Sequence, residues 1–346
     1  MGVIKVLIVD DSALVRQAYS TLLSTERDIE VIGTAGDPYI AVQKIQKEKP
    51  DVITLDVEMP RMDGITFLKK LMSQAPMPVV VISNKTVDGA EVALKALEAG
   101  AVDVMAKPNV ADEVSFAESR IALADKIRSA FHSKKVKKHT EVTPATAKPQ
   151  SIGKSNFSSS GVIAVGASTG GTEAIRVFLE SLTPPMPPIL IVQHMPDKFT
   201  AGFATRLNEL CALNVKEAED LEPVLPGTVY IAPGNNHMTI ANHHGRTVIK
   251  ISKGELVNRH RPSVNVLFNS VAEVKGKNTI GVILTGMGDD GATGMLAIHE
   301  RGGYTIAQDE QTSVVFGMPH KAINAGGVSR VLPLHEISRD VLERIG

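Results

Sequence analysis

Short β-branched apolar runs alternate with longer helical stretches through the first 131 residues, and this alternation limits the fold more than any other feature. Between the runs, apolar side chains recur at helical spacing. Strands that alternate with helices pair in parallel, because each helix carries the chain back across the sheet. The sequence therefore predicts a flavodoxin-like (βα)5 domain over residues 1–131, with strands at 3–9, 30–35, 52–56, 79–83 and 102–106.

The alternation stops at residues 132–160. This segment holds clustered lysines, two prolines and a run of serines, with few large apolar side chains. Such a composition cannot bury a core, so we interpret the segment as a flexible linker.

Strand-like runs return from residue 161 onward, and they again alternate with helical stretches. These runs lie at 161–166, 189–193, 229–232, 238–241, 247–251, 280–285 and 303–308. We therefore expect residues 161–346 to form a second α/β domain that is doubly wound and mostly parallel. One stretch, residues 229–252, instead has short strands around Gly and Asn turns. It is interpreted as an antiparallel insertion in the parallel arrangement.

Charge and cysteine content restrict the binding partners and the cellular compartment that can be expected. The formal net charge of −1 gives no electrostatic reason to bind nucleic acid or an anionic membrane. No apolar run approaches the roughly 20 residues of a membrane span, so no membrane insertion is expected. Cys211 is the only cysteine, which excludes an internal disulfide framework and is typical of a cytoplasmic protein.

Acidic side chains end two of the strands predicted in the first half. Asp10 and Asp11 follow the first strand, Asp56 ends the third, and Lys107 follows the fifth. Because ligands of open parallel sheets bind at the carboxyl ends of the strands, these residues are expected to converge. Three converging carboxylates repel one another unless a hard cation joins them, and an oxygen-rich site of this kind suits Mg²⁺.

Polar residues also end three strands of the second half. Ser168 lies in the Gly-rich turn GASTGG, His194 follows the next strand, and Asp289 and Asp290 follow a later one. Serine, histidine and aspartate together suit acyl transfer, because the histidine removes the hydroxyl proton and the carboxylate orients the histidine. The turn alone is ambiguous, since Gly-rich turns also hold phosphates. The alternative is therefore a second domain that binds a ligand without catalysis.

The first half resembles the receiver domain of response regulators. This resemblance implies that Asp56 accepts phosphate from a histidine kinase, that Asp10, Asp11 and Asp56 hold Mg²⁺, and that Ser83 and Lys107 sense the phosphate. Receivers commonly carry an aromatic switch residue where this chain has Val104, so signal transmission is expected to depend less on an aromatic flip. The matching segments are VDDS at 9–12, LDVEMPRMDG at 55–64, Ser83, and KP at 107–108.

The second half resembles the catalytic domain of the CheB family, the chemotaxis protein-glutamate methylesterases. The matching segments are GASTGGTEA, QHMP, YIAPGNNHM, RPSVNVLF, LTGMGDDGATGM and AQDEQTSVVFGMP. The resemblance implies a phosphorylation-activated serine hydrolase that removes methyl groups from glutamates of chemoreceptors, releases methanol, and also deamidates glutamines. No cofactor is expected for the esterase reaction.

The same resemblance assigns the catalytic roles residue by residue. Ser168 is the implied nucleophile, His194 the general base and acid, and Asp290, in preference to Asp289, the residue that orients His194. The backbone amide of Met287 is the implied oxyanion donor. His237 is expected to line or support the cleft, while Arg259 and Arg261 either contact acidic receptor segments or are solvated or salt-bridged.

Overall fold

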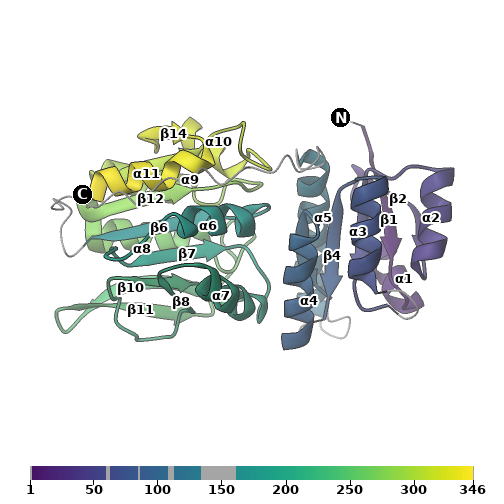
Figure 1. The fold of residues 1–346 in the computed structure, drawn as a ribbon, viewed down its shortest axis with the longest axis horizontal. Coiled ribbons are helices and arrows are strands. Elements are labelled where there is room, and N and C mark those ends of the chain that lie inside the picture. Colours follow the sequence, from purple (N-terminus) through teal and green to yellow (C-terminus); the bar gives the residue numbers. More distant parts are fainter. Residues whose placement is uncertain (1, 60–62, 85, 108–112, 134–160, 346) are drawn as a thin grey trace. The chain divides into compact units, whose positions relative to one another are not determined.

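The computed structural model describes residues 2–59, 63–84, 86–107, 113–133 and 161–345. The chain divides into two compact units, Met1–Lys137 and Lys138–Gly346, which are described separately (Figure 1). Most of the predicted linker, residues 134–160, lies outside the described residues. Among the residues that are described, no helix combines the length and the apolar character needed to cross a membrane.

The first unit is a five-stranded parallel sheet with the strand order β2-β1-β3-β4-β5. This order confirms the predicted flavodoxin-like arrangement, and each strand begins and ends within one residue of its expected position. The strands are β1 (Ile4–Val9), β2 (Ile29–Ala35), β3 (Val52–Asp56), β4 (Val79–Ser83) and β5 (Asp103–Ala106), and the helices are α1 (Ala13–Leu23), α2 (Pro38–Lys47), α3 (Gly64–Gln74), α4 (Val87–Glu98) and α5 (Glu113–His132).

The inner strands of this sheet are buried on both faces, as the continuous apolar runs require. Every residue of β3 and β4 is buried. Val6 and Ile8 of β1 pack into one cluster with Leu123 and Ile127 of α5. The sheet is therefore a rigid platform, and the residues that follow its strands are held at one edge.

The second unit contains a seven-stranded parallel sheet with the order β14-β13-β12-β6-β7-β9-β8. Its strands are β6 (Val162–Ala167), β7 (Ile189–Gln193), β8 (Asn214–Glu217), β9 (Thr228–Ile231), β12 (Thr279–Ile283), β13 (Tyr304–Gln308) and β14 (Arg330–Leu332), and its helices are α6 (Gly171–Glu180), α7 (Phe199–Leu210), α8 (Val264–Lys275), α9 (Ala292–Glu300), α10 (Met318–Asn324) and α11 (Leu334–Ile345), with a short 3₁₀ helix at Gly276–Asn278.

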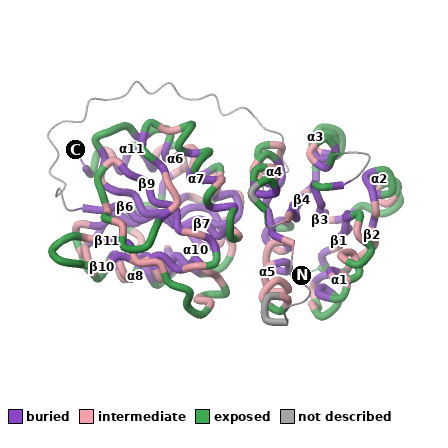
Figure 2. Tube along the Cα trace, turned by 90° about the horizontal axis from the view of Figure 1, so that it is seen from below, coloured by how far each residue is buried: buried purple, intermediate pink, exposed green. Residues whose placement is uncertain are grey.

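Helices cover both faces of this sheet, which confirms the doubly wound arrangement (Figure 2). Helix α6 contacts α7 and α11 on one face, and α9 contacts α8 and α10 on the other. The inner strands between these layers are buried, whereas the outer surfaces of the helices are exposed.

The antiparallel insertion is smaller than the sequence suggested. Strands β10 (His237–His243) and β11 (Arg246–Ser252) form an antiparallel pair of their own. Strand β9, which was expected within the insertion, instead pairs in parallel with β7 and β8. The physical reason is burial: all four residues of β9 are buried, and only the interior of the main sheet covers both faces of a strand.

Candidate active site

Three adjacent strands of the second unit bring the predicted catalytic residues to one edge of the sheet. Ala167 of β6 pairs with Gln193 of β7, so Ser168 and His194 each follow directly after paired residues. The backbone N–H of His194 donates to the carbonyl of Ala167 at 3.1 Å, and that of Ser168 donates to the carbonyl of Thr285 at 3.0 Å. The end of β6 thus lies between the segments that carry the histidine and the aspartate.

Asp290 and His194 are in direct contact. His194 Nε2 lies 2.8 Å from Asp290 Oδ2, and both side chains are buried. Asp290 also accepts hydrogen bonds from Ser263 Oγ at 2.7 Å and from the backbone N–H groups of Val264 at 2.7 Å and Asn265 at 3.0 Å. These donors form the beginning of helix α8, where the helix dipole favours a negative charge.

These contacts keep the Asp290 carboxyl ionised. Burial alone would raise its pKa, but the hydrogen bond and the charge of His194, together with the donors from Asn265 and Ser263, hold the pKa of Asp290 below its usual value. An ionised carboxylate can only accept a hydrogen bond, so its partner nitrogen must carry the hydrogen. Asp290 therefore favours the His194 tautomer with hydrogen on Nε2.

The same tautomer leaves Nδ1 as the basic nitrogen of His194. This atom is buried and has no hydrogen-bond partner among the described residues, and Ser168 Oγ does not bond to it. Catalytic hydrogen bonds of free enzymes are often long and tighten when substrate binds. The structure therefore places Ser168 and His194 at neighbouring strand ends, with an unpaired base on the histidine.

Close packing fixes the turn around Ser168. Gly170 has a φ of +77°, and a Cβ on Gly171 would lie 2.1 Å from Gln193 Oε1, so neither position accepts a side chain without displacement. The side chain of Gln193 donates to the carbonyls of Ser168 at 2.9 Å and His194 at 3.3 Å. This buried amide links the backbones that carry the serine and the histidine.

The segment after β12 passes directly against the serine. A Cβ on Gly286 would approach Ser168 Cβ to 2.7 Å. Met287 follows, and its backbone N–H donates no hydrogen bond to the described residues. An unpaired amide next to the serine has the character that an oxyanion donor requires.

His237 and Arg261 support the loop that holds Asp290. His237 Nδ1 accepts from the backbone N–H of Ser263 at 3.2 Å, while its Nε2 donates to the carbonyl of Glu255 at 2.8 Å. Arg261 donates through Nε and Nη2 to Asn235 Oδ1 at 2.9 and 2.7 Å. Both residues therefore have structural partners, and Arg259 is exposed in a turn with a φ of +67°.

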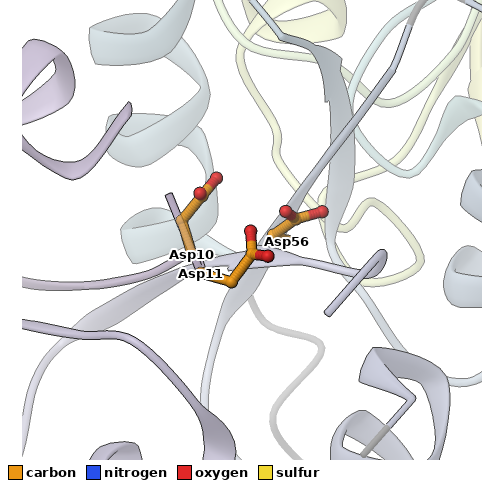
Figure 3. A group of neighbouring side chains, drawn as sticks. All are labelled: Asp10, Asp11 and Asp56. Carbon is orange, nitrogen blue, oxygen red and sulfur yellow. The ribbon is translucent and has the colours of Figure 1, made fainter. Parts of the chain in front are cut away.

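The acidic residues of the first unit also converge (Figure 3). One carboxylate oxygen from each of Asp10, Asp11 and Asp56 lies within 4.8 Å of the others. Lys107 Nζ lies 2.6 Å from Asp56 Oδ2 and 3.8 Å from Asp10 Oδ2. Asp10 Oδ2 is buried without a hydrogen bond, so the site has an unsatisfied oxygen ligand and fits a hard divalent cation.

Ser83 lies at the same edge, but its hydroxyl already donates a hydrogen bond to the backbone of helix α4. Its Oγ donates to the carbonyl of Gly89 at 3.0 Å, and its carbonyl accepts from the backbone N–H of Lys107 at 2.8 Å. Val104 is buried in β5 beside Val81 of β4. The structure thus brings Lys107 to Asp56, whereas the phosphate-sensing role of Ser83 remains a prediction.

Replacing Asp10 by asparagine is expected to raise the free energy of unfolding at pH 8 without Mg²⁺ by about 1–2 kcal/mol. Burial, offset in part by Lys107 and reinforced by Asp56, raises the pKa of Asp10 to about 6. The folded state therefore binds this proton more tightly than the unfolded chain does. The ionised carboxylate destabilises the fold above about pH 6, and this penalty disappears below about pH 4.

Urea denaturation at pH 4 and pH 8 measures the effect of the Asp10 substitution. The exposed neighbour supplies the control, Asp11→Asn, for which a smaller change is expected because its carboxylate is already solvated. An equal gain for Asp10→Asn at both pH values would contradict the explanation.

Comparison with known proteins finds family matches for both units. Residues 163–341 match the family described as CheB methylesterase, and residues 6–116 match the response regulator receiver domain. The chain is 51% identical over 355 residues to a protein-glutamate methylesterase/protein-glutamine glutaminase of Rhizobium johnstonii, covering 98% of this chain and 97% of that protein. A protein of the same description from Salmonella choleraesuis is 51% identical over 345 residues, covering 100% of this chain and 98% of the relative.

A solved structure covers the second unit alone. The CheB methylesterase catalytic domain of Thermotoga maritima is 41% identical and superposes with a TM-score of 0.53, covering 54% of this chain and 98% of that structure.

Proposed function

Because the chain belongs to the CheB methylesterase family, we propose that Ser168, His194 and Asp290 form its catalytic triad. The protein is a protein-glutamate methylesterase and protein-glutamine glutaminase, and its receiver domain makes it a phosphorylation-regulated protein of chemotaxis. The observation that carries the triad is the 2.8 Å contact between His194 Nε2 and Asp290 Oδ2, which leaves Nδ1 unpaired. The alternative function, a second domain that binds a ligand without catalysis, is not favoured.

The first half of the reaction forms an acyl-enzyme. Ser168 Oγ attacks the γ-carbonyl carbon of a glutamyl methyl ester while His194 Nδ1 takes the hydroxyl proton. The negative charge that develops on the carbonyl oxygen is stabilised by the Met287 N–H. His194 then gives the proton to the methoxy oxygen, the carbon–oxygen bond breaks, and methanol leaves.

The second half restores the serine. A water molecule attacks the acyl carbon, His194 accepts a proton from this water, and the proton passes back to Ser168 Oγ as the ester bond breaks. The product is a free glutamate side chain. A glutamine side chain follows the same path, except that ammonia is the leaving group of the first step. Methylesterase and glutaminase activities therefore share one acyl-enzyme.

Asp290 has two electrostatic tasks in this scheme. It holds His194 with Nδ1 as the acceptor, and it stabilises the imidazolium that forms in each half-reaction. The contacts from Ser263, Val264 and Asn265 support both tasks, because they keep the carboxylate ionised and fixed in place. The proposed reaction needs no cofactor.

We place the regulatory site at Asp56 of the receiver domain. Asp10, Asp11 and Asp56 would hold Mg²⁺, which when bound neutralises the charge of an incoming phosphoryl group. Asp56 accepts that group from a chemotaxis histidine kinase, and Lys107 Nζ pairs with the phosphate. Ser83 can donate its hydroxyl to the phosphate once its hydrogen bond to the carbonyl of Gly89 is broken. The proposed domains are a receiver at 1–131, a linker at 132–160 and a catalytic domain at 161–346.

The substrates are proposed to be methyl-accepting chemoreceptors, which the catalytic domain meets in the cytoplasm. The free thiol of Cys211 supports a reducing compartment.

Treatment with a small phosphodonor and Mg²⁺ is expected to raise the rate of methanol release by about 5- to 100-fold, the range of ordinary allosteric coupling energies. The reason is that a phosphoryl group adds negative charge at Asp56 and shifts the receiver to another state. Methanol release from receptor membranes methylated beforehand measures the rate with and without the donor.

The matched variant for this experiment is Asp56→Asn, which keeps the side-chain size and removes the phosphate acceptor. Its basal rate should equal that of the unphosphorylated wild type, and the donor should not change it. Full activation of Asp56→Asn would assign the phosphorylation site elsewhere, and no methanol release by the wild type under either condition would contradict the proposed function itself.

A further inference from the structure

A second histidine covers the face of His194. The rings of His194 and His260 are stacked with their centroids 3.7 Å apart and their planes at 13°. Rings stacked this closely are in van der Waals contact across their faces. The hydrogen bond to Asp290 holds only one edge of the His194 ring, and a ring held at one edge can still rotate about that bond. Contact across a face opposes this rotation.

The position of His260 is itself fixed by a tight turn. The backbones of Val257 and His260 exchange two hydrogen bonds, of 3.1 and 2.9 Å. Asn258, inside the turn, donates through Nδ2 to Asp289 Oδ1 at 3.0 Å and accepts from Asn265 Nδ2 at 2.9 Å. The turn is therefore braced against the loop before α9 and against the first turn of α8.

The short segment 260–263 thus contacts two members of the proposed triad, His194 and Asp290. Residue 260 covers the base, and three residues further along Ser263 begins the set of donors that hold Asp290. Between them, Arg261 is bound to Asn235 Oδ1 and to the carbonyl of Gly254. A displacement of this segment would move the ring contact and the carboxylate together.

We propose that His260 is a positioning residue that sets the ring plane of His194, so that Nδ1 points to Ser168 while Nε2 stays on Asp290. The inference rests on the proposed role of His194 as the base. It attributes the effect to the flat face of the ring, because the two rings are stacked.

Two substitutions separate the ring from the imidazole chemistry. In the full-length protein, His260→Ala should lower kcat by about 10- to 100-fold with KM nearly unchanged, since small misplacements of catalytic groups have effects of this size. His260→Phe keeps a planar aromatic ring and should restore kcat to within about threefold of the wild type. The control is His243→Ala, a change at an exposed histidine of the β10–β11 hairpin, which should have no effect.

Methanol release from methylated receptor membranes gives kcat and KM for each variant. An unchanged kcat in His260→Ala would overturn the inference, and so would a folded His260→Phe that is as slow as the alanine variant. If the alanine variant does not fold, the phenylalanine variant decides: kcat within about threefold of the wild type supports ring positioning, and a loss above about tenfold contradicts it. Absence of activity in the wild type would instead reject the proposed function.

Discussion

Ser168→Ala is expected to lower kcat for methyl-ester hydrolysis by about 10⁶-fold, the loss seen when the nucleophile of a serine triad is removed. Alanine has no hydroxyl to attack the γ-carbonyl, so no acyl-enzyme can form. The backbone around position 168 should remain in place, because its contacts are made by the main chain: N–H to Thr285, and the carbonyl to Gly171 and Gln193. KM should therefore change little.

Methanol release over long incubations measures this residual rate. Ser181→Ala is the matched control, because Ser181 follows the same helix α6 at its far end and its hydroxyl donates to the carbonyl of Val177. It should retain the full rate. A Ser168→Ala protein that works within about tenfold of the wild type would assign the nucleophile to another residue.

Asp290→Asn is expected to lower kcat by about 10⁴-fold, as found when a triad carboxylate becomes an amide. The carboxylate accepts four hydrogen bonds, and asparagine offers a single acceptor oxygen. Its amide hydrogens would face other donors or favour the wrong tautomer of His194. The unsatisfied buried groups should also lower the free energy of unfolding by about 1–3 kcal/mol.

Asp289→Asn is the control for this substitution. Asp289 is exposed and accepts from Asn258, so its loss should change kcat by less than about tenfold. Kinetics of methanol release and thermal denaturation of both variants give the comparison. An equal loss of kcat in the two variants would contradict the assignment of Asp290, in preference to Asp289, to the triad.

The periodicity of the sequence predicted the strands whose burial is complete. The continuous apolar runs at β1, β3, β4, β6, β7 and β12 correspond to strands covered on both faces. Strands β8 and β14 were not predicted, because both lie at sheet edges and carry polar residues such as Lys216 and Arg330. An edge strand needs no continuous apolar run, so its sequence resembles a loop.

The approximate place of the candidate site was also predictable. Parallel strands end at one edge, so Ser168, His194 and the aspartates could be expected together before any coordinates were known. The choice of Asp290 required the family resemblance. The structure adds the contacts that separate the two aspartates: one is buried at the start of α8, and the other is exposed.

The supporting residues could not be predicted from the sequence. Gln193, His260 and Asn265 act through contacts that depend on loop paths and strand register, which periodicity does not encode. Ser263 differs from these residues in that serine is a common N-cap and helix α8 begins at the next residue. Its second contact, with Asp290, becomes visible only when α8 and the loop after β12 are brought together.

Trapping the acyl-enzyme with hydroxylamine tests the central claim most directly. Wild-type protein should be given a methylated receptor and, separately, the same receptor with glutamine at that site, and the ratio of glutamyl hydroxamate to glutamate should be measured. A common acyl-enzyme at Ser168 predicts equal ratios from the two substrates and no enzymatic hydroxamate from Ser168→Ala. Unequal ratios, or hydroxamate formed at the wild-type rate by Ser168→Ala, would contradict the mechanism.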